Sequence, residues 1–585
     1  MSINILLTFL IVISLVLTLY KNWLKPSLAF IFAVFSFVLL KIITIEDFLQ
    51  GLANKQIILI FLLIILTSGI QKNLGKSFFY TLFKKNLSPF QFRLRMMLTV
   101  SGLSSMLNNT PVVAFMIPYV KNWSESNGYA ASKFLIPLSF ATILGGMITI
   151  VGTSTNLVLN GLIVQSGLPS LQYSDFLLLG GIVTILGLIY LAFFSEKMLP
   201  NTIARKETLL EHLNEYLVET RVNSASPLIG KTIEEAGLRH LKDLFLVEIK
   251  RGERNITAVS SDRIIHSEDI LFFAGNTKSI LDLINENNGL ELPDTSHILS
   301  NGFSAMTEAV IPSGSSLVGI TLKDLGFRDR YKASVISVYR KGEKVKENLG
   351  ETYLKEGDLL LLLCSKDFSS VISNRDLIVL SKSGEIDTEL SLRKTLPSII
   401  SIALLLIGIF GFVDLFLAAF VGILIMTLFK IINLNQLKSA VDIDLLIILV
   451  SALAVGIAIQ KSGSATFLVN QISSIFVELS PIWAIGILFA LTLGLTALIT
   501  NAAAVSIMFP VAYEMGLGFG ASLTPYFIAI AFAASADFMT PIGYQTNLMV
   551  MGPGNYKFSD YTKIGLPLTL IYSSVVISFI YLYYF

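Results

Sequence analysis

Amide and hydroxyl residues recur at matching spacing in two apolar stretches of the chain. The landmarks are Asn109, Pro118 and the run 152–156 in the first stretch, and Asn501, Pro510 and the run 543–547 in the second. Each asparagine precedes its proline by nine positions, and each run reads G-x-x-T-N. Amides and hydroxyls are costly in hydrocarbon unless they bind something. Their placement at corresponding positions of two halves therefore predicts a ligand site at a repeat interface.

These residue types suit an ion together with its counter-ion. Carbonyl and hydroxyl oxygens are ligands for a hard cation such as sodium, whereas amide N–H groups and helix N-termini favour an oxyanion. The candidate binding residues are Asn108, Asn109, Thr110, Thr153, Ser154, Thr155, Asn156, Thr500, Asn501, Thr546 and Asn547. We call residues 108–110 the first tip and residues 500–502 the second tip. The alternative to a binding role for each tip is a helix cap or a packing contact, which Asn and Thr also make in membrane bundles.

One carboxylate, Asp537, lies within an apolar segment. An ionisable residue at membrane depth is a functional candidate by default, so Asp537 is a possible coupling residue. It could relay protons, balance a cation or pair with a hydroxyl such as that of Ser535. No Ser/His/Asp, paired-carboxylate or P-loop pattern occurs in the sequence. We therefore expect neither an enzyme nor a bound organic cofactor, and the ions expected are those that the chain transports.

Composition indicates a polytopic α-helical membrane protein. The chain has 585 residues, of which 53% are hydrophobic and 14% are charged, whereas soluble domains carry about 25% charged residues. The net charge of +2 gives no reason to expect nucleic acid as a partner. The single cysteine excludes an internal disulfide, and the four histidines have no metal-ligand spacing.

The apolar segments form two blocks, residues 1–204 and 386–585. We expect spans at 3–20, 26–43, 56–70 and 176–194 in the first block, and at 396–412, 414–429, 442–459 and 564–584 in the second. Glycine and proline interrupt two further spans, 132–164 and 525–550, so these should be broken helices. Polar tips predict re-entrant hairpins at about 89–120 and 466–512. Landmarks in the two blocks keep offsets of 389 to 392 residues (460 − 71, 547 − 156, 501 − 109), which indicates an internal duplication.

Lysine and arginine predict the orientation of the chain. Basic residues gather at 21–25, 72–95 and 205–206. All three groups fall on the cytosolic side if the N-terminus is outside. Five crossings then place the middle of the chain in the cytosol, the second half must run inverted, and the C-terminus is also outside. We expect a multi-pass protein of the inner cell membrane, with the lipid bilayer as its partner.

Residues 205–385 differ from both blocks because they are charged and alternate like short strands, as at 244–250, 335–340 and 358–364. This segment also repeats, with an offset of 89: residues 226–230 correspond to 315–319, and Asp269 corresponds to Asp358. The pattern predicts two small α/β modules, 205–296 and 297–385.

The tip of the first block, Asn108-Asn109-Thr110, resembles the Ser-Asn-Thr signature of the divalent anion–sodium symporter family. In that family the signature recurs once per half, and here Thr500-Asn501-Ala502 stands at the second place. The two G-x-x-T-N runs resemble the second pair of elements in that family. The resemblance covers both apolar blocks, about two-thirds of the chain. Asn108 and Thr500 depart from the signature serines, and Ala502 lacks the threonine hydroxyl, which puts one sodium site in question and leaves proton coupling open.

This resemblance implies an inverted-repeat transporter with two re-entrant hairpins, broken helices and usually a homodimer. It implies sodium-coupled symport of a divalent oxyanion, sulfate first, or of a dicarboxylate. Sodium would be held through Asn109, Asn156, Asn501 and Asn547. The middle modules resemble TrkA-C domains, which implies cytosolic regulation by an unknown small molecule. The alternatives are a cation/proton antiporter or arsenite-type permease of the same superfamily, and a membrane sensor without transport.

Overall fold

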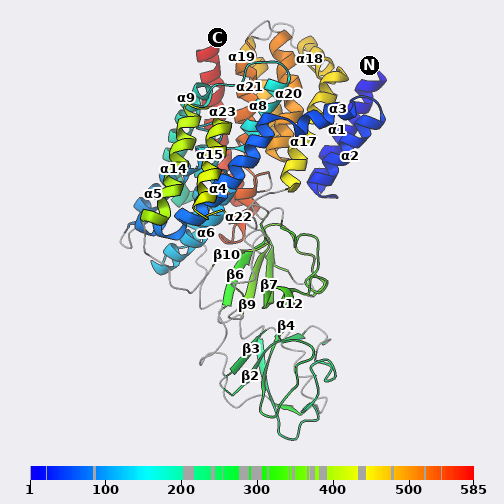
Figure 1. Ribbon diagram of the computed structural model, residues 1–585, viewed down its shortest axis with the longest axis vertical. Helices are drawn as coiled ribbons and strands as arrows, with labels where there is room; N and C mark the ends of the chain where they lie inside the picture. The colour runs from blue at the N-terminus through cyan, green and yellow to red at the C-terminus, as the bar shows by residue number, and fades with distance from the viewer. Residues whose placement is uncertain are drawn as a thin grey trace.

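The computed structural model places helices in both terminal parts of the chain and β-strands between them (Figure 1). It describes residues 2–21, 23–82, 87–201, 217–238, 241, 244–252, 254–257, 259–275, 289–291, 306–312, 315–340, 343–345, 350–364, 368, 376–380, 392–432, 443–475, 480–518, 522–541 and 543–585. The expected domain boundaries at 204/205, 296/297 and 385/386 lie outside these residues. Both chain termini lie at the end of the helical body that is remote from the strands (Figure 1).

Helices of the first part are α1 (Ile3–Lys21), α2 (Pro26–Leu39), α3 (Ile45–Leu52), α4 (Lys55–Leu82), α5 (Pro89–Ser104), α6 (Asn109–Ser126), η1 (Ala131–Lys133), α7 (Leu135–Gly146), α8 (Ser154–Gln165) and α9 (Tyr173–Met198). Those of the last part are α14 (Leu392–Ile409), α15 (Leu415–Leu428), α17 (Ile443–Lys461), α18 (Ser464–Ile475), α19 (Pro481–Thr496), α20 (Asn501–Gly518), α21 (Thr524–Ser535), α22 (Gln545–Met551) and α23 (Phe558–Tyr584).

Corresponding helices of the two parts have similar lengths. α5 and α19 have 16 residues each, α6 and α20 have 18 each, and α7 and α21 have 12 each. α9 has 26 residues and α23 has 27. The shared periodicity of polar and helix-breaking residues therefore gives the same succession of elements twice.

Both interrupted spans are broken, as the sequence predicts. α7 ends at Gly146 and α8 begins at Ser154, while α21 ends at Ser535 and α22 begins at Gln545. α7 is buried along its whole length, and so is α21 from Pro525 onward. A helix that is apolar on all sides belongs in the interior of a bundle. The chain breaks therefore lie deep inside the protein, where irregular backbone is tolerated in a membrane protein.

The two polar tips lie between helix pairs, but both pairs differ in extent from the expected hairpins. The first pair, α5–α6, ends at Ser126 rather than near 120. The second pair begins at Pro481 rather than at 466, because residues 464–475 form the separate helix α18. Gly463, with φ +77°, ends the preceding helix, and the chain bends there by 63°. A positive φ is open to glycine without steric cost, which is why the turn forms at this position.

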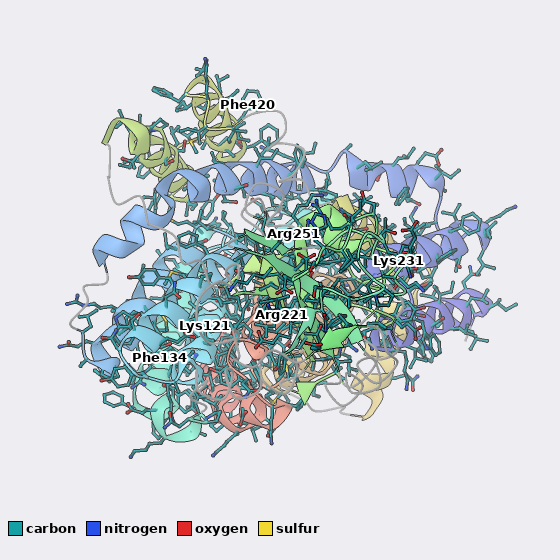
Figure 2. All side chains as sticks on the ribbon, turned by 90° about the horizontal axis from the view of Figure 1, so that it is seen from below. Lys121, Phe134, Arg221, Lys231, Arg251 and Phe420 are labelled. Carbon is teal, nitrogen blue, oxygen red and sulfur yellow. The ribbon has the colours of Figure 1, made fainter. Side chains whose placement is uncertain are left out.

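Three described segments are long and apolar enough to cross a membrane, namely Ile45–Ile70, Tyr173–Met198 and Phe558–Tyr584. The bent pair α17–α18 passes the same test when its two helices are counted as one span. Shorter apolar helices of 10–17 residues make up much of the rest of the bundle. Apolar side chains remain exposed on α15, where Phe420 is 54% and Leu428 is 71% exposed. Figure 2 shows Phe420 projecting from one edge of the helical body.

The described strands form two five-stranded antiparallel sheets. The first has the order β3-β2-β4-β1-β5, with β1 (Leu217–Val222), β2 (Leu244–Arg251), β3 (Arg254–Thr257), β4 (Ile270–Gly275) and β5 (Leu290–Glu291). The second has the order β10-β6-β9-β7-β8, with β6 (Met306–Val310), β7 (Ala333–Arg340), β8 (Glu343–Lys344), β9 (Leu359–Cys364) and β10 (Ile378–Val379), and it is accompanied by the short helix α12 (Phe327–Tyr331). The strands predicted at 244–250, 335–340 and 358–364 are confirmed as β2, β7 and β9.

The two sheets share one topology and one ion pair. The second sheet, read from β8 to β10, has the same strand order as the first sheet. Strands β8, β7, β9, β6 and β10 correspond to β3, β2, β4, β1 and β5. A guanidinium binds a fully buried carboxylate in each, Arg251 to Asp269 at 2.7 Å and Arg340 to Asp358 at 2.8 Å. Planar guanidinium and carboxylate groups match in shape, and here both pairs bind through two nitrogens. The offset of 89 in the sequence thus corresponds to one repeated fold.

The second sheet lies directly against the helices. Val310, Ile378 and Leu380 belong to the same apolar cluster as the helical core. Glu308 of β6 forms an ion pair with Lys121 of α6. Figure 2, seen from the strand end, shows Lys121 beside the sheets.

Candidate functional site

Four helices begin at the polar landmarks. α6 begins at Asn109, α8 at Ser154, α20 at Asn501 and α22 at Gln545. The residues that precede α6, α8 and α22 make no side-chain cap hydrogen bond. A helix start leaves backbone N–H groups unpaired and carries partial positive charge. Four such starts in one region would form an anion-binding environment.

Contacts between the two halves bring three of these helix starts together. Asn109 is fully buried, and its Nδ2 donates to the hydroxyl of Tyr544. The Thr153 hydroxyl is also a hydrogen-bond partner of Tyr544. Next to them, Thr110 Oγ1 donates to Gln545 Oε1 at 3.1 Å. The starts of α6, α8 and α22 therefore meet, although Asn109 and Tyr544 are 435 residues apart in the sequence.

The start of α20 joins the same cluster through Gly543. A Cβ placed on Gly543 would lie 2.7 Å from the carbonyl oxygen of Thr496, the last residue of α19. The Thr496 hydroxyl in turn lies 2.8 Å from Asn501 Oδ1. Only a residue without a side chain allows the loop before Tyr544 to approach the second tip this closely.

Each tip asparagine accepts a hydrogen bond from the same relative position. Ser104 donates to Asn109 Oδ1, and Thr496 donates to Asn501 Oδ1. Both hydroxyls stand five positions before their asparagine. The sequence prediction omitted this pair, although the repeated spacing was a signal that could have revealed it. In the first half, the N–H₂ group of the same amide donates to Tyr544 of the other half.

The asparagines of the G-x-x-T-N runs hold the broken backbone. Asn156 Nδ2 donates to the Thr149 carbonyl at 3.4 Å, and Asn547 Nδ2 donates to the Thr540 carbonyl at 3.1 Å. The separation is seven residues in both. Asn156 Oδ1 is buried and has no hydrogen-bond partner among the described residues. This acceptor is therefore available to a cation.

The second run is held by a residue that the sequence did not predict. Ser139 of α7 lies with its hydroxyl 2.9 Å from Thr546 Oγ1 and 2.7 Å from Asn547 Oδ1. All three side chains are buried. In the first half, the hydroxyl oxygens of Thr153 and Thr155 are 3.4 Å apart, and both side chains are also buried. The first half thus supplies a hydroxyl to the second run across the interface.

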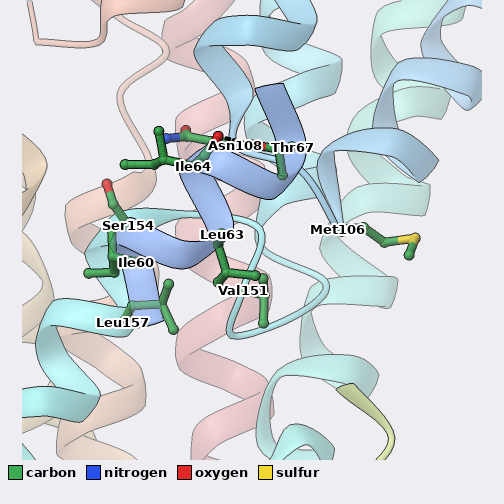
Figure 3. A pocket seen from close by; sticks show the side chains of 9 residues that line it. All are labelled: Ile60, Leu63, Ile64, Thr67, Met106, Asn108, Val151, Ser154 and Leu157. Atoms are coloured by element: carbon green, nitrogen blue, oxygen red, sulfur yellow. Dashed lines mark hydrogen bonds between the residues drawn. The ribbon is translucent and has the colours of Figure 1, made fainter. Parts of the chain in front are cut away.

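Two predicted residues lie away from this cluster. Asn108 and Ser154 line a cleft against α4, together with Met106 and Leu63, as Figure 3 shows. Thr500 immediately precedes Asn501, and its buried hydroxyl oxygen makes no hydrogen bond to any residue that the structure describes. The described structure therefore brings Asn109, Thr110, Thr153, Asn501 and the second run together, and it places Asn108 and Ser154 on the outer face of the first tip.

Asp537 lies in the break between α21 and α22 and is 2% exposed. Its Oδ1 accepts a hydrogen bond from Thr540 at 3.1 Å, and its backbone carbonyl accepts one from Asn547 at 2.8 Å. In the part of the chain that the structure describes, its Oδ2 has no hydrogen-bond partner. The carboxylate is therefore part of the same loop that carries the second run.

The citrate transporter family model matches residues 9–525. A "Putative sulfur deprivation response regulator" of Chlamydomonas reinhardtii is 32% identical over 95% of this chain and 97% of its own length. An uncharacterized transporter of Synechocystis is 30% identical over 97% of this chain and 95% of its own. Sodium/sulfate cotransporter 2 of Chlamydomonas reinhardtii is 28% identical over 63% of this chain, which is 43% of that protein.

A solved structure, that of the YdaH transporter of Alcanivorax borkumensis, matches with a TM-score of 0.44 at 11% identity, over 92% of this chain and 87% of that one. This likeness is too distant to support a statement about the present chain. The family match, in contrast, extends over more than half of the chain and includes both polar tips and the first G-x-x-T-N run. The chain therefore belongs to the citrate transporter family and is a multi-pass membrane transporter.

Proposed function

We propose that the chain is a secondary active transporter that carries a divalent oxyanion such as sulfate, or a dicarboxylate, together with sodium. The observation that carries this proposal is the cross-half cluster in which Asn109 meets Tyr544 at the starts of α6 and α22. The described side chains of this cluster are amides, hydroxyls and one carboxylate. Neutral N–H and O–H donors with helix N-termini bind an oxyanion without a fixed cation. Co-bound sodium then balances the charge of the anion.

Sodium is assigned to the oxygen atoms of Asn109, Asn156, Asn501 and Asn547 and to nearby backbone carbonyls. Asn156 Oδ1 accepts no hydrogen bond from the described residues, whereas the other three amide oxygens accept hydrogen bonds from Ser104, Thr496 and Ser139. Each hydroxyl can rotate its hydrogen away, so that its own oxygen and the amide oxygen both face a cation. Two relatives are named as sodium/sulfate cotransporters, and these names support sodium and sulfate as the transported pair.

The repeated order of helices supports an inverted-repeat architecture with five crossings per half. In this arrangement the chain lies in the inner cell membrane. Both termini are outside the cell, and residues 205–385 are in the cytosol. The exposed apolar face of α15, where Phe420 projects, suits lipid or a second copy in a homodimer (Figure 2).

Two TrkA-C-like modules regulate the transporter in this proposal. The second sheet contacts both helices of the cross-half cluster: Glu308 pairs with Lys121 of α6, and a Cβ on Gly357 would lie 2.9 Å from Leu548 of α22. A small molecule that shifts this sheet would therefore act on Asn109 and on the second run together.

Uptake of radiolabelled sulfate into proteoliposomes, with and without a sodium gradient, tests the function. We expect Asn109→Ala and Asn501→Ala each to reduce sodium-driven uptake to the background of empty liposomes. The protein should stay folded, because losing one buried amide costs about 1–3 kcal/mol. Asn127→Ala is the matched control, since Asn127 caps the opposite end of α6 through Trp123.

Normal uptake by either tip variant would contradict the site assignment. Uptake driven by a proton gradient and indifferent to sodium would favour a proton-coupled permease, a reading that the buried carboxylate of Asp537 supports. Absence of any anion uptake, with ligand binding to residues 205–385, would instead favour a membrane sensor.

A further inference from the structure

Positive charges gather where α9 ends, at a distance along the chain from every residue of the cross-half cluster. Arg93 of α5 donates from its guanidinium to the Glu196 carboxylate at 2.9 Å and to the Ala192 carbonyl at 3.2 Å. Lys133 of η1 donates from Nζ to the carbonyls of Glu196 and Leu199, at 2.7 and 2.6 Å. The last carbonyls of a helix have no partner within it and carry partial negative charge. Both cations therefore cap this end of α9.

A third cation completes the group. Among the described residues, the charged side chains that act on Lys133 are Arg93, Lys563 and Glu196. Lys563 is exposed and belongs to α23, which lies beside α9 (Figure 1). We call Arg93, Lys133, Glu196 and Lys563 the α9-end cluster. Its three cations and one carboxylate leave a net charge of +2 (3 − 1), so it attracts an anion through the exposed Lys563.

An apolar stripe on α9 leads to this cluster. Ile185, Ile189 and Phe193 are 60%, 50% and 63% exposed. They follow one another at intervals of four residues, and Glu196 comes three residues after Phe193. Residues three or four apart lie on the same side of a helix. Because α9 is long and apolar enough to cross a membrane, the stripe faces acyl chains and ends at the charged group.

The length of α7 places the cluster at the level of the lipid headgroups. α7 begins at Leu135, two residues after Lys133, and ends at Gly146, where the first break starts. Its 12 residues span about 18 Å at a rise of 1.5 Å per residue. Half the thickness of the hydrocarbon core is about 15 Å. A break near the middle of the bilayer therefore puts Lys133 at its surface.

We propose that the α9-end cluster binds the phosphate of an anionic phospholipid such as phosphatidylglycerol. Lys133 and Lys563 hold the headgroup, and an acyl chain lies along the stripe that ends at Phe193. The continuity of the stripe with the charges favours a lipid over a free phosphate, which would use the cations alone. Glu196 weakens the binding because its carboxylate repels the phosphate. One headgroup between Lys133 and Lys563 joins the two halves of the chain, and this site is separate from the proposed transport site.

Thermal unfolding of the purified full-length protein in a nonionic detergent tests the site. Phosphatidylglycerol or phosphatidylcholine with the same acyl chains is added, because a ligand that binds the native state raises the unfolding temperature. We expect phosphatidylglycerol to stabilise the wild-type protein more. Lys563→Gln should raise the half-saturating concentration of phosphatidylglycerol about fivefold, the effect of one cation at an anionic surface. Glu196→Gln should lower it, since the repelling charge is gone.

Lys25→Gln is the matched control, because Lys25 is an exposed lysine that directly precedes α2. This variant should keep the wild-type titration with phosphatidylglycerol. Equal stabilisation of the wild type by the two lipids would overturn the proposal, and so would an unchanged titration in Lys563→Gln. An effect of Lys25→Gln as large as that of Lys563→Gln would also overturn it, because net charge would then act without a defined site.

Glycerol phosphate separates the headgroup from the lipid, since it carries the phosphate without acyl chains. We expect it not to stabilise the protein at the concentration at which phosphatidylglycerol saturates. Stabilisation equal to that by phosphatidylglycerol, and lost in Lys563→Gln, would assign the cluster to a soluble phosphate compound and overturn the lipid site.

A measurement on the wild-type protein alone tests the ionic contact. Salt screens exposed charges, so added N-methyl-D-glucamine chloride should reduce the preference for phosphatidylglycerol over phosphatidylcholine. A preference that does not change with salt would contradict binding through Lys563.

Discussion

At the scale of single residues, Tyr544 decides how the two halves meet. Asn109 and Tyr544 are both buried, and the phenol oxygen accepts the amide hydrogen of the first tip. The first half has Thr153 at the matching position, and Thr153 bonds to the same tyrosine. Tyrosine reaches across the interface where threonine could not, because its hydroxyl stands at the end of a long rigid ring. The hydrogen bond from Asn109 to Tyr544 therefore joins the first tip to the second run across the interface between the halves.

Tyr544→Phe tests this role. The change removes the acceptor for Asn109 Nδ2, so we expect the sulfate-free protein to lose about 1–3 kcal/mol of stability. Saturating sulfate should narrow the difference, because the oxyanion can accept the freed N–H. Unfolding temperatures with and without sulfate provide the measurement. Tyr513→Phe on α20 is the control, and an equal loss in both variants would contradict the special role of Tyr544.

A second residue-scale feature is Glu248 on β2, which lies outside the helical bundle and is 1% exposed. Burial raises the pKa of its carboxyl group from 4.5 to about 7, against the smaller opposing effect of Lys250. The folded state therefore favours the protonated form. The protonated carboxyl group of Glu248 therefore makes its full contribution to the stability of the folded state below its unfolded pKa of about 4.5. This contribution is lost as the pH rises from about 4.5 through about 7.

We expect the first sheet to open more readily at pH 8 than at pH 5. Amide hydrogen exchange of peptides from β2, corrected for the intrinsic effect of pH, measures this opening in the full-length protein. Glu248→Gln should remove the pH dependence. Peptides from β7 serve as the internal control, since Ser337 stands at the matching position of the second sheet. Equal pH dependence in both sheets would contradict the assignment.

At the scale of elements, the broken helices explain how polar groups are accommodated at depth. Each break frees backbone groups, and each is held by an asparagine that donates to a carbonyl seven residues earlier. The helices that precede the breaks are apolar on every side, so they pack into the interior and place the breaks there. α22 lies at the end of the helical body that faces the strands (Figure 1), and a Cβ on Gly357 would lie 2.9 Å from its Leu548. The second sheet is therefore able to contact α22 directly.

At the scale of the whole molecule, the ion pair of Lys121 and Glu308 joins the second sheet to α6. Lys121 is 6% exposed and also lies 3.8 Å from Glu125 on the same helix. A buried ion pair that loses one partner costs about 3–5 kcal/mol, because the other charge stays buried. This contact is therefore the point at which a change in the sheet would reach the helix that begins at Asn109.

Charge exchange tests that connection. We expect Lys121→Glu to loosen the contact, since three acidic side chains would then face one another, and Glu308→Lys to do so by opposing two cations. The double variant should restore it. Hydrogen exchange in β6 reports the contact, and sulfate uptake reports its effect on transport. Single variants with wild-type exchange in β6 would show that the pair does not hold the sheet.

The sequence by itself determined the local parts of this protein. The G-x-x-T-N runs and the glycines before them predicted where two spans break, and the offset of 89 predicted two modules, which the structure has as two sheets of one topology. These features are local, because a missing Cβ or a lost backbone hydrogen bond acts within a few residues. The hydrogen bond from Ser104 to Asn109 is also local, because it joins residues five positions apart. The repeat of this spacing at Thr496 and Asn501 could have predicted it from the sequence.

Only the tertiary structure decided which residues meet. Asn109 bonds to Tyr544 and Ser139 bonds to Asn547, across 435 and 408 residues, and no local rule selects these partners. The same applies to Asn108 and Ser154, whose side chains were predicted to bind the ion but lie in the cleft beside α4. Helix packing sets which face of a helix start points inward, and that depends on the fit of side chains along the whole bundle rather than on the residues at the tip.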